Sequence, residues 1–156
     1  MSDQGTPPVP ETVQEGTDVF ISYSRKDIEF VRWLNEQFQE AERQPWIDWK
    51  GINPSEEWWL AILRGIDAAN TFVFVLSPDS AASDTCRKEI DRSVSSGKRI
   101  VPVVCRSVEG VEVHPDLAKL NYIFLCTDAE REDGLGKLFA ALDTDFDHVR
   151  AHTKFL

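Results

Sequence analysis

The sequence predicts an α/β fold in three layers, with a five-stranded parallel sheet and helices on both of its faces. Short apolar runs alternate with segments in which apolar residues recur at helical spacing, as expected when strands and amphipathic helices follow one another. The run over residues 71–76 is apolar throughout, which is typical of a strand buried on both faces. The 156 residues are 42% hydrophobic, enough for one domain with a sizeable core.

The first half of the chain contributes two strands and two helices. Residues 1–17 are polar and include three prolines, so we expect a disordered leader. The first strand begins at Val19 and ends at residues 22–24, and after a polar turn Asp27 can cap a helix. That helix carries one apolar face (Phe30, Val31, Leu34, Phe38 and Ala41). A short strand around Trp46 and Ile47 leads to a loop over residues 48–55. Ser55 then caps a helix with an apolar stripe (Trp59, Ile62, Leu63 and Ile66).

The second half continues the alternation. The strand over residues 71–76 stops at Ser77-Pro78, a loop follows, and Ser83 or Asp84 can cap a helix that Gly97 ends. The expected buried stripe of this helix is Cys86, Ile90 and Val94. Residues 99–105 form a fourth strand, in which Pro102 indicates an edge position or a bulge. We expect irregular structure over residues 106–120, a short strand over 121–125, and a last helix from Gly134 with five stripe residues (Leu135, Leu138, Phe139, Leu142 and Phe146).

Charge and composition exclude several classes of partner. The net charge of −10 disfavours nucleic acid and anionic membrane surfaces, which bind basic faces. No apolar run approaches the roughly 20 residues of a membrane span. Residues 1–15 lack the basic and apolar regions of a secretory signal. The three cysteines have no paired spacing, so we expect buried free thiols in a reducing cytoplasm.

Glu89 is the candidate catalytic residue. It lies at the edge of the Cys86–Ile90 stripe, early in its helix and above the carboxyl end of the central strand. In open α/β sheets, ligands bind at that end. The alternative is a solvated glutamate paired with Arg87 or Arg92, because most helix glutamates face water.

Basic and aromatic residues near the strand ends are further candidates. Arg25 and Lys26 could meet phosphates, or they could pair with Asp27 or Glu29 on the surface. Trp49 lies in a polar loop and is hard to bury, so it is a candidate contact for a base or a partner protein.

Several other kinds of site are not expected. His148 and His152 could share a metal, but no third ligand lies nearby in the sequence, so we expect no metal site. No glycine-rich dinucleotide fingerprint follows the first strand, and no phosphate-binding P-loop is present. A phospho-receiver would need an aspartate at the end of the third strand, where this chain has Leu76-Ser77-Pro78.

Three motifs resemble the Toll/interleukin receptor (TIR) domain, a flavodoxin-like module of innate immunity and bacterial anti-phage defence. The first is Asp18-Val-Phe-Ile-Ser-Tyr-Ser24, and the second, over residues 48–54, resembles the BB loop of the family. The third is Leu76-Ser-Pro78, followed at the family's spacing by Ser83, Cys86 and Glu89. The resemblance spans about residues 18–145.

The resemblance implies an activity and a set of site residues. Many bacterial, plant and axonal TIR domains hydrolyse the nicotinamide–ribose bond of NAD. The resemblance implies that Glu89 is the catalytic glutamate and that Tyr23, Ser24 and Arg25 lie near the substrate. It also assigns the aromatic residue after the BB loop to Trp58, or to Trp59 by a shift of one residue.

One position departs from the pattern of active members. Four residues before the glutamate they often have tryptophan, and this chain has Thr85. Trp49 or Trp58 could supply the missing ring.

The expected function is therefore an NAD+ nucleosidase that releases nicotinamide and ADP-ribose or a cyclic ADP-ribose. NAD+ is then the substrate and no cofactor is required. The resemblance implies activation by self-association with other TIR domains through the 48–55 loop. The alternative is a non-enzymatic adaptor, which Thr85 favours. We expect the domain to span residues 18–149, with residues 150–156 starting a linker or a further helix that leads to a C-terminal sensor region.

Overall fold

The computed structural model describes residues 18–49 and 55–154, with side chains up to residue 143. Within these residues one five-stranded sheet has the order β3-β2-β4-β5-β6, and every neighbouring pair is parallel. The strands are β2 (Val19–Ser22), β3 (Trp46–Ile47), β4 (Thr71–Leu76), β5 (Arg99–Val104) and β6 (Ile123–Phe124). The order confirms the predicted fold, because it is that of a flavodoxin-like doubly wound sheet.

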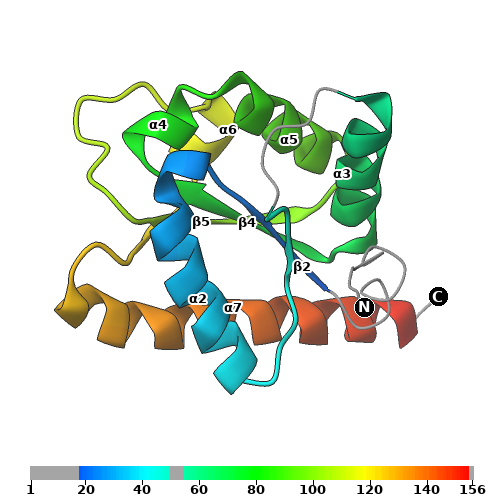
Figure 1. The fold of residues 1–156 in the computed structure, drawn as a ribbon. Coiled ribbons are helices and arrows are strands. Elements are labelled where there is room, and N and C mark those ends of the chain that lie inside the picture. Colours follow the sequence, from blue (N-terminus) through cyan, green and yellow to red (C-terminus); the bar gives the residue numbers. More distant parts are fainter. Residues whose placement is uncertain (1–17, 50–54, 155–156) are drawn as a thin grey trace, which may run out of the picture.

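Helices cover both faces of this sheet (Figure 1). On one face lie α2 (Ile28–Glu40) and α7 (Asp128–Lys154). On the other lie α3 (Glu56–Ala68) and α5 (Asp84–Ser95), with the short helices α4 (Pro78–Ala81) and α6 (Pro115–Ala118). Alternate side chains of β4 divide between the two cores: Val73 and Val75 pack with α2 and α7, whereas Phe72, Phe74 and Leu76 pack on the side of α3 and α5.

Stacked aromatic rings join three strands on the α3–α5 face. The ring of Phe20 in β2 lies 4.8 Å from that of Trp46 in β3 and 5.6 Å from that of Phe72 in β4. The stack continues to Phe74, 6.4 Å from Phe72. Gly65 lets α3 approach these rings, because an added Cβ would lie 3.0 Å from the Trp46 indole.

Most predicted helix ends are confirmed. The Ser55 hydroxyl accepts a hydrogen bond from the Trp58 N–H, and that of Ser83 accepts one from the Cys86 N–H. Gly97 follows α5 with a φ of +73°, the left-handed conformation that favours glycine at the end of a helix.

The expected cap at Asp27 is wrong. A 3-10 turn, η1 (Arg25–Asp27), precedes α2, and Ser24 caps it by accepting a hydrogen bond from the Lys26 N–H. Asp27 makes no side-chain capping bond to α2. Its carboxylate is instead buried, where Ser77 and Arg106 donate hydrogen bonds to it.

Two predicted core positions are also wrong. Val94 is 40% exposed, and Ser93 takes the buried position beside it, where its hydroxyl donates to the Ile90 carbonyl. Ala41 is exposed because α2 ends at Glu40.

The last helix begins before the predicted Gly134. Thr127 and Glu130 each accept a hydrogen bond from the other's backbone N–H, which is a capping box at the start of α7. Gly134 lies inside the helix and packs against β6, where an added Cβ would be 2.9 Å from the Phe124 carbonyl oxygen. The glycine therefore marks a close approach and not a helix start.

Three local predictions need adjustment. Residues that we expected to be loop or irregular form α4 and α6, which Ser77 and His114 cap. Pro102 lies in an interior strand, but β5 pairs with β6 only through Val103 and Val104. The first part of β5 therefore has a neighbour on one side, which accommodates the proline.

Some predictions cannot be compared with the structure. The expected leader and residues 50–54 of the 48–55 loop lie outside the described residues, as does the side chain of Phe146. In the part of the chain that is described, none of the helices has the length and apolar character needed to cross a bilayer.

Candidate active site

The Glu89 side chain faces the protein interior. Its helix, α5, buries Cys86, Glu89, Ile90 and Ser93 along one side, and Glu89 is only 6% exposed. The Ser22 hydroxyl, at the end of β2, donates a 2.6 Å hydrogen bond to Oε1 of Glu89. The solvated alternative is therefore wrong: Arg92, one of its expected partners, pairs with Asp67 instead.

Burial makes Glu89 an unusually weak acid. Loss of solvation raises its pKa from an ordinary 4.5 to about 7, the Ser22 hydrogen bond lowers it, and the negative charge of Asp48 raises it. A carboxyl group with this pKa is present in both protonation states near neutral pH. Strongly shifted groups of this kind are common in functional sites.

Glu89 lines a cleft of about 250 Å³ at the carboxyl end of β2. One wall is formed by residues 22–26 and the other by the start of α5, including Ser83, Thr85 and Cys86. The rest is lined by Trp58 and Ile62 of α3, by Asp48, and by Phe20 and Ile21 of β2. The volume is below the roughly 300–1,000 Å³ of pockets for drug-sized ligands, so the cleft can enclose about one nucleoside.

A set of hydrogen bonds ties the end of β2 to the start of the 48–55 loop. The Tyr23 hydroxyl donates to the Asp48 carbonyl at 2.6 Å. Arg25 donates through Nη1 to the Tyr23 hydroxyl and to the Trp49 carbonyl, at 2.7 and 2.9 Å. Burial also raises the pKa of Tyr23, so its hydroxyl remains a donor at neutral pH.

Three tryptophans, Trp58, Trp59 and Trp49, differ in their position relative to the cleft. Trp58 lines the cleft, and its indole N–H donates a 3.0 Å hydrogen bond to Oδ2 of Asp48. Trp59 is partly buried against the α3–α5 core and is not among the described residues that line the cleft. Trp49 is 42% exposed and is not among the described residues that line the cleft.

The structure thus brings together five of the predicted site residues: Glu89, Tyr23, Ser24, Arg25 and Trp58. Thr85, the residue that departs from the pattern described above, also lines the cleft. The expected partners of Arg25 are engaged elsewhere, since Asp27 pairs with Arg106 and Glu29 with Arg32.

Sequence reasoning missed Ser22 and Asp48 as site residues. Ser22 follows Phe20 by two residues and so points to the same face of the sheet, a signal that strand alternation could have supplied. Cys86 was expected in the core and was not among the predicted site residues, yet it also lines the cleft. Burial raises the pKa of its thiol to about 12, so it is not a nucleophile at neutral pH. Among the described side chains, no three potential ligands gather to hold a metal ion.

Comparison with known families and structures gives a consistent result. A family model for the TIR domain matches residues 19–139. The fold is similar to the TIR domain of the Toll-related receptor TRR-2 from Hydra magnipapillata, with 23% identity, a TM-score of 0.69, and coverage of 81% of this chain and 98% of that one. It is also similar to the CMP N-glycosidase BcmB of Clostridium botulinum, with 17% identity, a TM-score of 0.56, and coverage of 77% and 98%. A search of curated proteins found no significant match.

Proposed function

This chain belongs to the TIR domain family, and from that premise we propose that it is an NAD+ nucleosidase. It would hydrolyse the nicotinamide–ribose bond and release nicotinamide with ADP-ribose or a cyclic ADP-ribose. The observation that carries the proposal is the buried Glu89 carboxyl group, with a pKa of about 7, in a cleft at the carboxyl end of the sheet.

The chemistry needs one carboxylate. The nicotinamide ring of NAD+ is cationic, and when the C–N bond breaks both bonding electrons go to its nitrogen, so it departs neutral without a general acid. The ribose is left as an oxocarbenium-like cation. In a water-poor cleft a carboxylate beside C1′ stabilises that charge more than it would in water. Water then bonds to C1′ and loses a proton, to Glu89 or to solvent.

The form of Glu89 required is the ionised one. Its Oε1 atom is fixed by Ser22, which leaves Oε2 to face the cation or to orient a ribose hydroxyl. Because the pKa is about 7, activity should rise through neutral pH as the carboxylate forms. Glu89 at lower pH would be neutral and would lack the stabilising charge.

The substrate extends beyond the cleft. The enclosed volume suits the nicotinamide riboside part, which Trp58 and Tyr23 border. Ser24, Arg25 and Lys26 lie on the wall next to them, where the basic side chains can meet the pyrophosphate. The adenosine would then lie outside, near Trp49 and the 48–55 loop.

Self-association is part of the proposal. We propose that the 48–55 loop of one protomer completes the site of the next, because the cleft of a single protomer is too small for a dinucleotide. Copies of a chain with a net charge of −10 repel one another at low salt. We propose that this domain acts in an immune or anti-phage defence protein. Its NAD+ hydrolysis should be weak in dilute solution and should increase with crowding, tethering or added salt.

The second candidate is a non-enzymatic adaptor that binds other TIR domains. The observation that favours it is Thr85, which lines the cleft where active relatives often have a stacking tryptophan. An adaptor would not need the raised pKa of Glu89, so the enzyme remains the function we favour.

The test measures nicotinamide release from NAD+ over a range of protein concentrations. The same assay is run with CMP, whose base is neutral, and there the release of cytosine is measured. We expect release from NAD+ that grows faster than protein concentration, and loss of release in Glu89→Gln. The matched control is Glu36→Gln, an exposed glutamate of α2, which should retain activity. No release from concentrated protein, or equal release by Glu89→Gln, would support the adaptor.

A further inference from the structure

A buried carboxylate lies just behind the wall of the cleft. Asp27 ends η1 and is 5% exposed. Its Oδ2 atom accepts a hydrogen bond from the Ser77 hydroxyl, and its Oδ1 atom lies 2.8 Å from both Nε and Nη2 of Arg106. A buried charge requires such partners, because an unpaired one would be strongly unfavourable.

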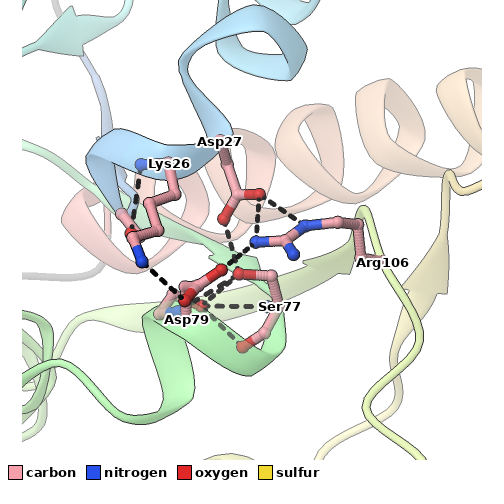
Figure 2. A network of polar contacts seen from close by, with 7 residues as sticks. Lys26, Asp27, Ser77, Asp79 and Arg106 are labelled. Carbon is pink, nitrogen blue, oxygen red and sulfur yellow. Dashed lines mark hydrogen bonds and ion pairs between the residues drawn. The ribbon is translucent and has the colours of Figure 1, made fainter.

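Arg106 joins this carboxylate to a second one. It follows β5, and its Nη2 atom donates a 2.6 Å hydrogen bond to Oδ2 of Asp79 in α4. The amino group of Lys26 lies 3.8 Å from the other oxygen of Asp79. Figure 2 shows that these side chains converge from η1, from α4 and from the segment after β5.

The network connects the two walls of the cleft. Ser24, Arg25 and Lys26 of the first wall are held through Asp27 at the end of the same turn. On the other side Ser77 caps α4, which leads directly to the Ser83 cap of α5 and so to the second wall. Arg106 itself is not among the described residues that line the cleft.

We infer that Arg106 is a positioning residue, which fixes the Ser24–Lys26 wall of the cleft against the α4–α5 wall through Asp27 and Asp79. The catalytic group is held separately, because Ser22 binds Glu89 from within the parallel ladder of β2 and β4. Loss of Arg106 should therefore weaken substrate binding by the wall and leave the chemistry at Glu89 largely intact. The expected effect on substrate binding rests on the proposed function, whereas the fixing of the Ser24–Lys26 wall by Arg106 does not.

The experiment compares Arg106→Gln and Arg106→Lys with Arg92→Gln in the full chain. Arg92 is a matched control, since it is 39% exposed against 46% for Arg106 and also binds a carboxylate, Asp67, through Nε and Nη2. The first measurement is hydrogen exchange of the Lys26 and Asp27 amides, which donate to the hydroxyl and the carbonyl of Ser24, the residue that caps η1. The second is kcat and KM for nicotinamide release.

We expect exchange at these two amides to be about tenfold faster in Arg106→Gln, the effect of losing a charged hydrogen bond, and unchanged in Arg92→Gln. KM should rise severalfold, with kcat within about twofold of the wild type. Arg106→Lys should give exchange rates and a KM between those of the wild type and Arg106→Gln, because lysine keeps the charge but cannot reproduce the guanidinium contacts with both carboxylates.

Unchanged exchange in both Arg106 variants would overturn the inference, as would an equal effect of Arg92→Gln or a loss confined to kcat. If Arg106→Gln does not fold, Arg106→Lys decides by the same criteria. If the protein releases no nicotinamide at all, the proposed function fails, but the exchange result still decides whether Arg106 positions the wall.

Discussion

Replacing Ser22 with alanine tests the role of Glu89 without removing its carboxylate. The change deletes a buried 2.6 Å hydrogen bond to an acid whose pKa is already about 7. That bond favours the ionised form, so its loss should raise the pKa further. A hydrogen bond contributes roughly 1.5–3 kcal/mol to a charged group and roughly 0.5–1.5 kcal/mol to a neutral one, so its loss disfavours the ionised form by about 1–1.5 kcal/mol, or about one pKa unit.

The consequence for activity depends on pH. At pH 7 about half of Glu89 is ionised in the wild type, whereas roughly 10% is ionised in Ser22→Ala, so kcat should fall about fivefold. At about pH 9 the difference should shrink to about twofold or less, since both proteins are then largely ionised. The assay is nicotinamide release at saturating NAD+ from about pH 5.5 to 9.5.

The matched control is Ser93→Ala. Ser93 is another buried serine of the same region, on α5, but its hydroxyl donates to the Ile90 carbonyl. Its pH profile should coincide with that of the wild type. A Ser22→Ala defect that is equally large at every pH, or a wild-type kcat that does not vary between pH 5.5 and 9.5, would refute the reasoning.

Three further predictions concern stability and reactivity. Between pH 4.5, the ordinary pKa of a glutamate, and about 7, the folded state holds a proton on Glu89 that the unfolded state has released, so stability falls as pH rises. The free energy of unfolding should fall by about 3 kcal/mol over this range. Thermal melting should therefore show Glu89→Gln to be more stable than the wild type at pH 8 but not at pH 4. An equal difference in stability at the two pH values would contradict this prediction. Gly134→Ala should destabilise the protein by about 2 kcal/mol or more, because the new Cβ would lie 2.5 Å from Leu125 Cδ2. The Cβ of Gly136→Ala would meet nothing within 4 Å, so this control should stabilise the protein by up to about 1 kcal/mol. Urea unfolding measures both changes. In native thiol labelling at pH 8, partly buried Cys126 should react before Cys86, whose thiol pKa is about 12; the reverse order would be evidence against the buried position of Cys86.

The fold was predictable because its signals are local. The continuous apolar run of β4 and the stripes of α2, α3 and α5 were read from spacing alone, and all of these elements are present. The errors occurred where a residue type that is typical of a helix end instead makes a contact with a distant part of the chain. Asp27 resembles a helix cap but binds Arg106, 79 residues away. Gly134 resembles a helix boundary but allows α7 to touch β6.

The candidate site was partly predictable for the same reason. Glu89 and the end of β2 follow from motif spacing and from the rule that ligands bind at the carboxyl ends of parallel strands. The choice between a solvated and a buried Glu89 depends on Ser22, 67 residues away, and no periodicity connects the two. The capping box at Thr127 and Glu130 was available in the sequence and would have corrected the start of α7.

The row of stacked rings from Trp46 through Phe20 to Phe72 and Phe74 has a mechanical consequence for the cleft above it. Offset-stacked rings on three adjacent strands pack the floor of the cleft tightly, so one strand should not shift without its neighbours. A ligand that needs a wider site should therefore displace the rim of the cleft, which includes the η1 turn and the start of α5, more readily than the sheet.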